Sequence, residues 1–221
     1  MDQKKLDQQS QHWEINFSNK PEMFGLSQSL AAEKALKLFR KNKINNIIEL
    51  GAGLGRDSTF FAKNLIHTTA LDYSLAGIDI IEQKIKKNDL TKYLSTKLFD
   101  IRKKLPFEDN SIEACYSHML YCMALSNNDL QNLNNEILRI LKPGGINIYT
   151  VRHIKDGDYK NGIPIGEDLY ENDGFIVHYF SKEKINSLLQ GFTNTNLENF
   201  EEGSFPRKLF YVVNIKKIKN Q

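Results

Sequence analysis

The feature that most constrains the fold is the segment 44–57, in which an apolar run stops in three alternating glycines and passes into a helix-like stretch. We interpret this order as a strand, a tight turn and a helix N-terminus. Glycine at positions 51, 53 and 55 allows positive φ and leaves no Cβ to block a ligand that rests on the main chain. The helix that begins near Asp57 adds free amide N–H groups and the positive end of its dipole. The turn therefore predicts a binding site of the kind that nucleotides use.

The glycine spacing separates two kinds of nucleotide turn. Dinucleotide folds carry G-x-G-x-x-G after the first strand, whereas this chain has G-x-G-x-G. Arg56 takes the place of the third dinucleotide glycine, and Glu49 lies just inside the strand end; both features disfavour NAD. The stretch resembles motif I of the class I S-adenosylmethionine-dependent methyltransferases, E/D-x-G-x-G-x-G. The resemblance implies that S-adenosylmethionine contacts Glu49, Gly51, Ala52, Gly53 and Gly55. The alternative is a glycine-rich turn without a ligand.

Length and composition indicate one soluble domain. The 221 residues lie in the single-domain range for an α/β fold, and 40% of them are apolar. The net charge of +3 is spread along the chain, which argues against a nucleic-acid or membrane partner. Cys115 and Cys122 are too few for a disulfide scaffold or a four-ligand zinc site, so we expect no metal and a reducing, cytoplasmic setting. No apolar run approaches the ~18 residues of a membrane span. The sequence leaves the oligomeric state open.

Periodicity and turn residues predict the other elements. Residues 1–11 are polar and are expected to fray, Ser27 is expected to cap a helix before the first strand, and Ser74 to cap the helix after the second. The remaining strands are expected at 67–72, 96–99, 112–117, 146–151, 192–200 and 209–216, and further helices at 58–64, 129–141 and 181–190. Glu201 to Gly203 is expected to open the loop of the last hairpin.

Two carboxylates follow predicted strands at positions that suit a nucleotide. Asp72 ends the second strand, 21 residues after Gly51, where a ribose bound on the first turn would present two hydroxyls. In the family that we take the chain to resemble, this acid binds the ribose and the next residue, here Tyr73, flanks the adenine. The family also implies that Asp100 meets the adenine amino group and that Ile101 gives the ring an apolar face. The alternatives are a solvated turn aspartate at 72 and a helix-capping aspartate at 100.

Two further segments strengthen the resemblance. Leu105, Pro106, Phe107, Asp109, Asn110 and Ser111 match a family pattern written lPF-DNSfD before the fourth strand, and Leu141 to Gly145 matches LkPGG before the fifth. The resemblance thus runs from about residue 28 to 151. It implies an α/β, Rossmann-like fold: a seven-stranded, mostly parallel sheet with an antiparallel last strand and helices on both faces.

The carboxyl end of the fourth strand should border the transferred methyl group, because in an open α/β sheet these ends face the ligand crevice. Ser117, His118 and Tyr121 lie there in the sequence. We expect Ser117 to contact the cofactor and His118 or Tyr121 to act in catalysis. The amino-methylating relatives that act on adenine or glutamine carry Asn-Pro-Pro-Tyr at this position, and this chain does not.

Two segments are expected to enclose the acceptor. Residues 1–26 are interpreted as an N-terminal cap on a methyltransferase domain of residues 27–221, with Trp13 and Phe24 as substrate contacts. Residues 152–180 show little periodicity and are interpreted as a substrate lid rooted at Arg152 and His153. The alternatives are simple packing under the cap and a surface insertion.

The functional prediction is transfer of a methyl group from S-adenosylmethionine to a small-molecule nucleophile by in-line displacement, with a general base optional. The Gly-Arg-Asp turn and the segment Pro206 to Phe210 are similar to thiopurine- and tellurite-type enzymes. The alternatives are a non-catalytic S-adenosylmethionine-binding regulatory module and methylation of a macromolecule, RNA or protein. The acceptor itself is not predicted.

Overall fold

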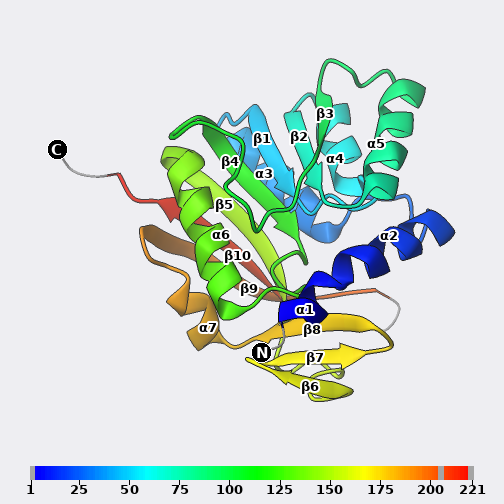
Figure 1. Ribbon diagram of the computed structural model, residues 1–221. Helices are drawn as coiled ribbons and strands as arrows, with labels where there is room; N and C mark the ends of the chain where they lie inside the picture. Colours follow the sequence, from blue (N-terminus) through cyan, green and yellow to red (C-terminus); the bar gives the residue numbers. More distant parts are fainter. Residues whose placement is uncertain (1–2, 204–206, 219–221) are drawn as a thin grey trace.

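The computed structural model describes residues 3–203 and 207–218, so small parts of the expected cap (1–26) and domain (27–221), Pro206 among them, lie outside the described residues. Seven strands form the body of one sheet (Figure 1), in the order β3 (Leu94–Leu98), β2 (His67–Asp72), β1 (Asn46–Leu50), β4 (Ile112–His118), β5 (Leu141–His153), β10 (Arg207–Lys216) and β9 (Phe192–Glu202). The first five strands are parallel to one another, and β10 is antiparallel to both β5 and β9. The predicted fold class is confirmed.

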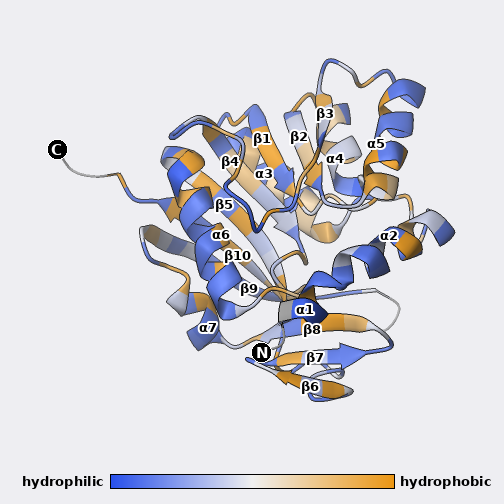
Figure 2. Cartoon of the chain, in the orientation of Figure 1, coloured by the Kyte–Doolittle hydropathy of each residue, from blue (hydrophilic) through white to orange (hydrophobic). Residues whose placement is uncertain are grey.

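Helices cover both faces of this sheet. The helices α3 (Leu30–Lys41), α4 (Arg56–Lys63) and α5 (Leu75–Lys87) pack on one face, and α6 (Asn127–Ile140) and α7 (Lys182–Ser187) on the other. Successive residues of β4 point to opposite faces, so Ala114 and Tyr116 join the cluster under α3 and α4 whereas Cys115 joins the cluster under α6. Figure 2 shows β1 in apolar colours and the outward face of α6 in mostly polar ones. The core therefore lies in two layers around β1 and β4.

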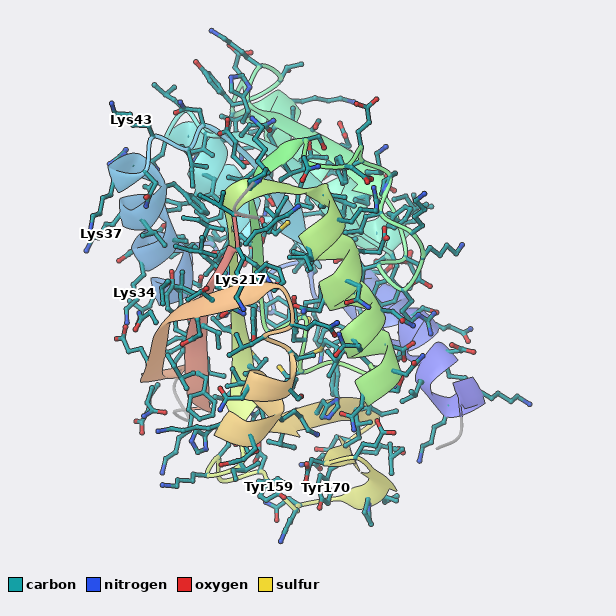
Figure 3. All side chains as sticks on the ribbon, turned by 90° about the vertical axis from the view of Figure 1, so that its left-hand side faces the viewer. Lys34, Lys37, Lys43, Tyr159, Tyr170 and Lys217 are labelled. Atoms are coloured by element: carbon teal, nitrogen blue, oxygen red, sulfur yellow. The ribbon has the colours of Figure 1, made fainter. Side chains whose placement is uncertain are left out.

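The segment after β5 differs from its prediction. Residues 163–180 form three antiparallel strands, β6 (Ile163–Gly166), β7 (Leu169–Asn172) and β8 (Phe175–Phe180), where an irregular stretch was expected. Arg152 of β5 pairs with Leu209 of β10 on one side, so its pairing with Tyr179 of β8 is on the side that β4 occupies lower down. The β6–β8 meander therefore continues the sheet beyond the carboxyl end of β4. Tyr159, just before it, and Tyr170 on β7 lie at the same end of the molecule (Figure 3).

The N-terminal residues also differ from their prediction. They form α1 (Gln3–Asp7) and α2 (Gln9–Asn19) instead of fraying, and α2 lies between α5 and β8 (Figure 1). The side chain of Gln9 donates to the Gly174 carbonyl at 2.8 Å and accepts from the Ile176 amide at 3.2 Å. These tertiary bonds order a segment whose composition alone predicts disorder. The cap of α3 is Ser29, which accepts from the Ala32 amide, and not Ser27.

Candidate active site

The glycine turn joins β1 to α4, and its conformation is held by the neighbouring strand. The amides of Gly51 and Ala52 both donate to the Leu71 carbonyl of β2, at 2.9 and 3.0 Å. All three glycines of the turn have positive φ. A Cβ on Gly51 would lie 2.7 Å from Leu120, and one on Gly55 would lie 2.5 Å from Ile81. These two glycines are therefore closely packed against Leu120 and Ile81, and a ligand contact at either of them stays a prediction.

Gly53 is the turn glycine that has room beside it. A Cβ there would meet only the ring of Phe17, at 3.5 Å, and its amide donates to Asp72 at 2.7 Å. The second oxygen of Asp72 accepts from the Ser74 amide at 2.9 Å. Asp72 is 4% exposed, so it is not a solvated turn residue. Burial raises the pKa of this carboxyl to about 6, although the bonds from Ser74 and Gly53 work in the opposite direction.

Glu49 lies beneath the turn. Its side chain is buried and accepts a hydrogen bond from the Ser58 hydroxyl of α4. Burial, together with the nearby charge of Asp57, raises the pKa of Glu49 well above its usual range. The structure thus places this motif acid where it joins β1 to α4, and its contact with a cofactor stays a prediction.

The predicted adenine contacts lie around the end of β3. Burial opposes ionisation of Asp100, but bonds from the Arg102 side chain (2.7 Å at the closest) and amide keep the pKa of this carboxyl below its usual value. Arg102 also pairs with Asp7 of α1. Tyr73 is partly buried beside Asp72, whereas Ile101 is almost completely buried and packs in the larger core cluster. Asp100 therefore does not cap a helix; it forms an ion pair that a cofactor would have to share.

The carboxyl end of β4 carries two polar side chains that differ in their hydrogen bonding. Ser117 is 1% exposed, and its hydroxyl has no hydrogen-bond partner among the described residues. His118 is bonded at both ring nitrogens: Nδ1 lies 3.0 Å from the Thr150 hydroxyl of β5, and Nε2 lies 3.0 Å from the Glu202 carboxylate of β9. The predicted base therefore has neither nitrogen free in this arrangement.

Tyr121 was expected beside the crevice, and the structure contradicts this expectation. Its side chain is fully buried in the core cluster, stacks on Tyr149 at 4.2 Å, and its hydroxyl accepts from Asn147 at 3.1 Å. Asn147 pairs with Cys115 in the middle of β4, well before the carboxyl ends of the strands. The chain turns back after Met119, which has a φ of 64°, and directs Tyr121 into the core.

The N-terminal cap closes over the glycine turn. The ring of Trp13 lies 5.3 Å from that of Phe17, 6.1 Å from Phe24 and 5.0 Å from Phe175 of β8. Phe17 is buried against Gly53 and Gly77, whereas Phe24 is 36% exposed. Aromatic side chains of the cap thus contact both the glycine turn and the β6–β8 meander.

The carboxylate of Glu14 attaches α2 to the N-terminus of α5. It accepts from the Ser74 hydroxyl at 2.5 Å and from the Ala76 amide at 3.0 Å. A negative charge at a helix N-terminus is favourable because it meets unpaired amides and the positive end of the dipole. The same charge lies near Asp72 and contributes to the raised pKa of that residue.

The two predicted substrate contacts after β5 separate in the structure. Arg152 is buried, pairs with Asp156 and with Asp158 at 2.6 Å, and places its guanidinium 5.4 Å from the Tyr179 ring centre. Its Nε is buried without a hydrogen-bond partner among the described residues. His153 instead lies against Phe210 of β10, at 4.1 Å, and its Nδ1 accepts from the Lys155 amide. Arg152 is therefore held by ion pairs inside the protein, whereas His153 lies on the β10 side.

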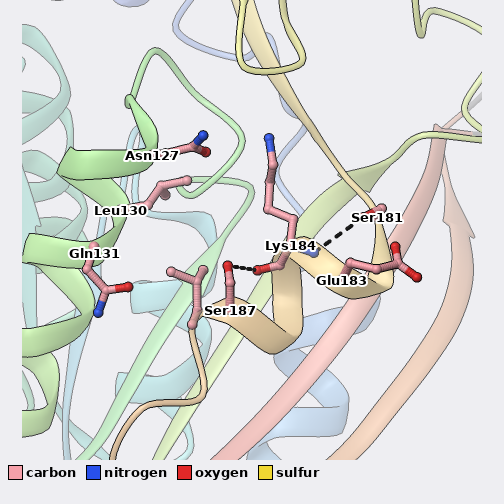
Figure 4. A pocket seen from close by; sticks show the side chains of 8 residues that line it. Asn127, Leu130, Gln131, Ser181, Glu183, Lys184 and Ser187 are labelled. Carbon is pink, nitrogen blue, oxygen red and sulfur yellow. Dashed lines mark hydrogen bonds between the residues drawn. The ribbon is translucent and has the colours of Figure 1, made fainter.

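A cavity of about 400 Å³ opens between α6 and α7 (Figure 4), where the ammonium of Lys184 is bonded to His178 at 2.6 Å and to the Glu167 carbonyl. Over residues 3–203 and 207–218 no group of three or more His, Cys, Asp or Glu side chains could hold a metal ion. Within the same ranges no helix is both long and apolar enough to cross a membrane.

Sequence reasoning did not identify Glu14, Thr150 or Glu202. Each comes from an element far along the chain from the residue that it contacts, and none belongs to a recognisable motif. Their contacts depend on tertiary structure, so no local signal could have indicated them.

Comparison with known proteins bears on the central part of the chain. A family model described as a methyltransferase domain matches residues 47–145. Phosphoethanolamine N-methyltransferase 1 of Triticum aestivum is 35% identical over 105 residues; the alignment covers 45% of this chain and only 20% of that protein.

Solved structures match more of the chain. The S-adenosylmethionine-dependent methyltransferase of Methanosarcina mazei has a TM-score of 0.72 at 18% identity, over 88% of this chain and 100% of that one. The 1,6-didemethyltoxoflavin-N1-methyltransferase of Burkholderia thailandensis, solved with 1,6-didemethyltoxoflavin and S-adenosylhomocysteine, has a TM-score of 0.73 at 12% identity, over 95% and 87%. Residues 47–145 thus match a methyltransferase domain model, and the chain has the fold of the solved S-adenosylmethionine-dependent methyltransferases named above.

Proposed function

We propose that this chain transfers the methyl group of S-adenosylmethionine to a small-molecule nucleophile. The observation that carries the proposal is the placement of Asp72 beside Gly53. The amides of Gly53 and Ser74 take one position on each carboxylate oxygen, which leaves acceptor capacity on both oxygens for the two ribose hydroxyls. The unpartnered Ser117 hydroxyl supports a ligand at the same edge of the sheet. The residues present therefore fit this cofactor.

Other residues of the crevice would complete the cofactor site. Asp100 would accept from the adenine amino group, and Tyr73 and Ile101 would flank the ring. Ser117 would bond the methionine part, and the backbone at Gly53 would allow close approach. S-adenosylmethionine supplies an electrophilic methyl group on a good leaving group, so the chain has to hold donor and acceptor in line and at close range.

The acceptor is proposed to be small because two elements roof the crevice. Trp13 of α2 contacts both Phe175 of β8 and Phe17, and Phe17 lies against Gly53 of the glycine turn; such a cover would exclude water and bulky substrates. The relatives described above include enzymes named for small molecules, phosphoethanolamine and 1,6-didemethyltoxoflavin. Both cysteines are free, which suits a reducing cytoplasm.

Binding and turnover should be tested separately. We expect calorimetric titration with S-adenosylhomocysteine to give one site per chain, and Asp79→Asn, an exposed change on α5, to leave the affinity unaltered. Methyl-labelled S-adenosylmethionine would then be offered to a panel of small amines, thiols, carboxylates and heteroaromatic nitrogens, with RNA and protein acceptors in parallel. Failure to bind S-adenosylhomocysteine would refute the site. Binding without turnover on any acceptor would favour a regulatory module, and transfer only to RNA or protein would overturn the small-molecule acceptor.

A further inference from the structure

Glu202 is an acidic side chain of β9 that contacts both the end of β4 and the start of α4. It was expected in a hairpin loop, but it is the last residue of the strand, and its side chain is 20% exposed. One carboxylate oxygen lies 3.0 Å from Nε2 of His118, and the other lies 3.7 Å from the guanidinium of Arg56, the residue directly after Gly55. Glu202 therefore connects the end of β4 with the cofactor turn.

The hydrogen bonds around His118 define which ring nitrogen carries the proton. The Thr150 hydroxyl oxygen accepts from the Met119 amide at 2.8 Å, so its own hydrogen is available for Nδ1 of His118 at 3.0 Å. Burial opposes ionisation of Glu202, but the bond from His118 and the nearby Arg56 hold the pKa of this carboxyl below its usual value. An ionised carboxylate only accepts hydrogen bonds, so Nε2 must donate. The network therefore places a proton on Nε2 and gives both ring nitrogens a partner.

Thr150 and Glu202 contact this imidazole, and residues from three further parts of the chain contact those two side chains. Thr150 comes from β5, Arg56 from α4, Glu202 from β9 and Met119 from the turn after β4; the amide of Leu30, at the start of α3, also bonds Glu202. Arg56 is held in turn by the Phe24 carbonyl of the cap, at 3.0 Å. The ring is therefore fixed from several directions at the edge of the sheet where the methyl group would lie.

We propose that Glu202 is a positioning residue of the methyl-transfer site. Its carboxylate fixes the orientation of the His118 ring on the acceptor side of the site. Through Arg56, it also connects His118 to the glycine turn. In this role His118 has no free nitrogen and does not take the proton of the acceptor. The inference rests on the proposed methyl transfer for its purpose, but the contact itself can be tested in the protein without any acceptor.

The test is nitrogen NMR of the histidine side chains in the full chain, which has five histidines. Protonated and unprotonated ring nitrogens have distinct shifts, and His118→Gln identifies the signals of residue 118. We expect two separate signals for His118 in the wild type, with Nε2 protonated. Glu202→Ala should collapse them towards an average, because neither tautomer is then held, and the isosteric Glu202→Gln should populate both tautomers. Glu201→Gln, the exposed neighbouring acid, is the matched control and should leave the spectrum unchanged.

Affinity for S-adenosylhomocysteine serves as the second measurement. Both Glu202 variants should bind it within about twofold of the wild type, because Glu202 touches no predicted cofactor contact. A wild-type His118 spectrum with averaged nitrogens, or spectra of both Glu202 variants identical to the wild type, would overturn the positioning role. Absence of S-adenosylhomocysteine binding in the wild type would instead refute the proposed function and leave the His118 spectrum as an independent result.

Discussion

Replacing Asp72 by alanine tests the cofactor site most directly. The carboxylate would accept two hydrogen bonds from the ribose, and bonds to a charged group contribute on the order of 1.5 to 3 kcal/mol each. Losing both costs at least about 3 kcal/mol, which is roughly 10²-fold in affinity because each 1.4 kcal/mol is tenfold. Asp100→Ala loses one bond, and Arg102 already competes for that carboxylate, so we expect at most about a tenfold loss.

The structure also changes the expected stability of this variant. Asp72 looks like an exposed strand end in the sequence, but it is buried, and its removal leaves the amides of Gly53 and Ser74 without an acceptor, at about 1 to 3 kcal/mol each. The same change removes a buried carboxylate whose pKa is raised to about 6. Relief of this burial cost increases the unfolding free energy by about 3 kcal/mol. Because the two effects oppose each other, we expect a net change in unfolding free energy within about 2 kcal/mol.

Calorimetric titration with S-adenosylhomocysteine decides between a ribose ligand and a structural carboxylate. Asp72→Asn keeps the shape and one acceptor oxygen, so its affinity should fall between those of the wild type and Asp72→Ala. Asp79→Ala on α5, which is exposed, is the control for loss of an acidic side chain. Equal affinities of the wild type and a folded Asp72→Ala protein would refute the reasoning.

Four further outcomes are expected. Affinity for S-adenosylhomocysteine should decrease as the pH is lowered through about 6, because protonation of Asp72 removes an acceptor. An affinity that stays unchanged down to about pH 5 would contradict this. Since this carboxyl has a raised pKa in the folded state, its contribution to stability should improve as the pH falls from about 6 towards 4, as thermal unfolding would show. Phe17→Ala should speed amide hydrogen exchange in α2 and leave exchange in β1 unchanged, because the ring attaches the cap to Gly53; equal exchange in α2 would argue against this attachment. Tyr121→Phe should lower the unfolding free energy by about 1 kcal/mol through loss of the Asn147 bond and leave cofactor affinity unchanged, whereas a tenfold loss of affinity would return Tyr121 to the crevice.

Much of the predicted cofactor site could be inferred from the sequence because short local patterns determine its strand, turn and helix cap. An apolar run before a glycine turn predicts strand and turn from backbone conformation alone. Parallel strands bring their carboxyl ends to one edge, so the position of Asp72 after one strand and of Asp100 after another predicted their place in the fold. Ser74 capped its helix as expected, because the signal lies within three residues.

The acceptor side could not be predicted, because its geometry depends on contacts between distant segments. Nothing near Tyr121 indicates that the chain reverses at Met119 and directs the ring into the core. Gly51 and Gly55 belong to the motif, but their neighbours Leu120 and Ile81 are visible only in three dimensions. The meander was read as irregular because its short strands alternate weakly; pairing of β8 with the end of β5 is what orders them.

The bonds of Gln9 to Gly174 and Ile176 have a consequence for how the chain is made. They join residues 165 and 167 positions apart, so α2 gains these partners only after β8 has left the ribosome. At about 5 to 20 residues per second, this segment waits on the order of ten seconds or more during synthesis, with Trp13 and Phe17 exposed. The first helices to be translated among the described elements would therefore be among the last to dock. Long-range contacts of this kind slow folding, and we expect the nascent chain to expose an aromatic segment to chaperones until the meander closes on it.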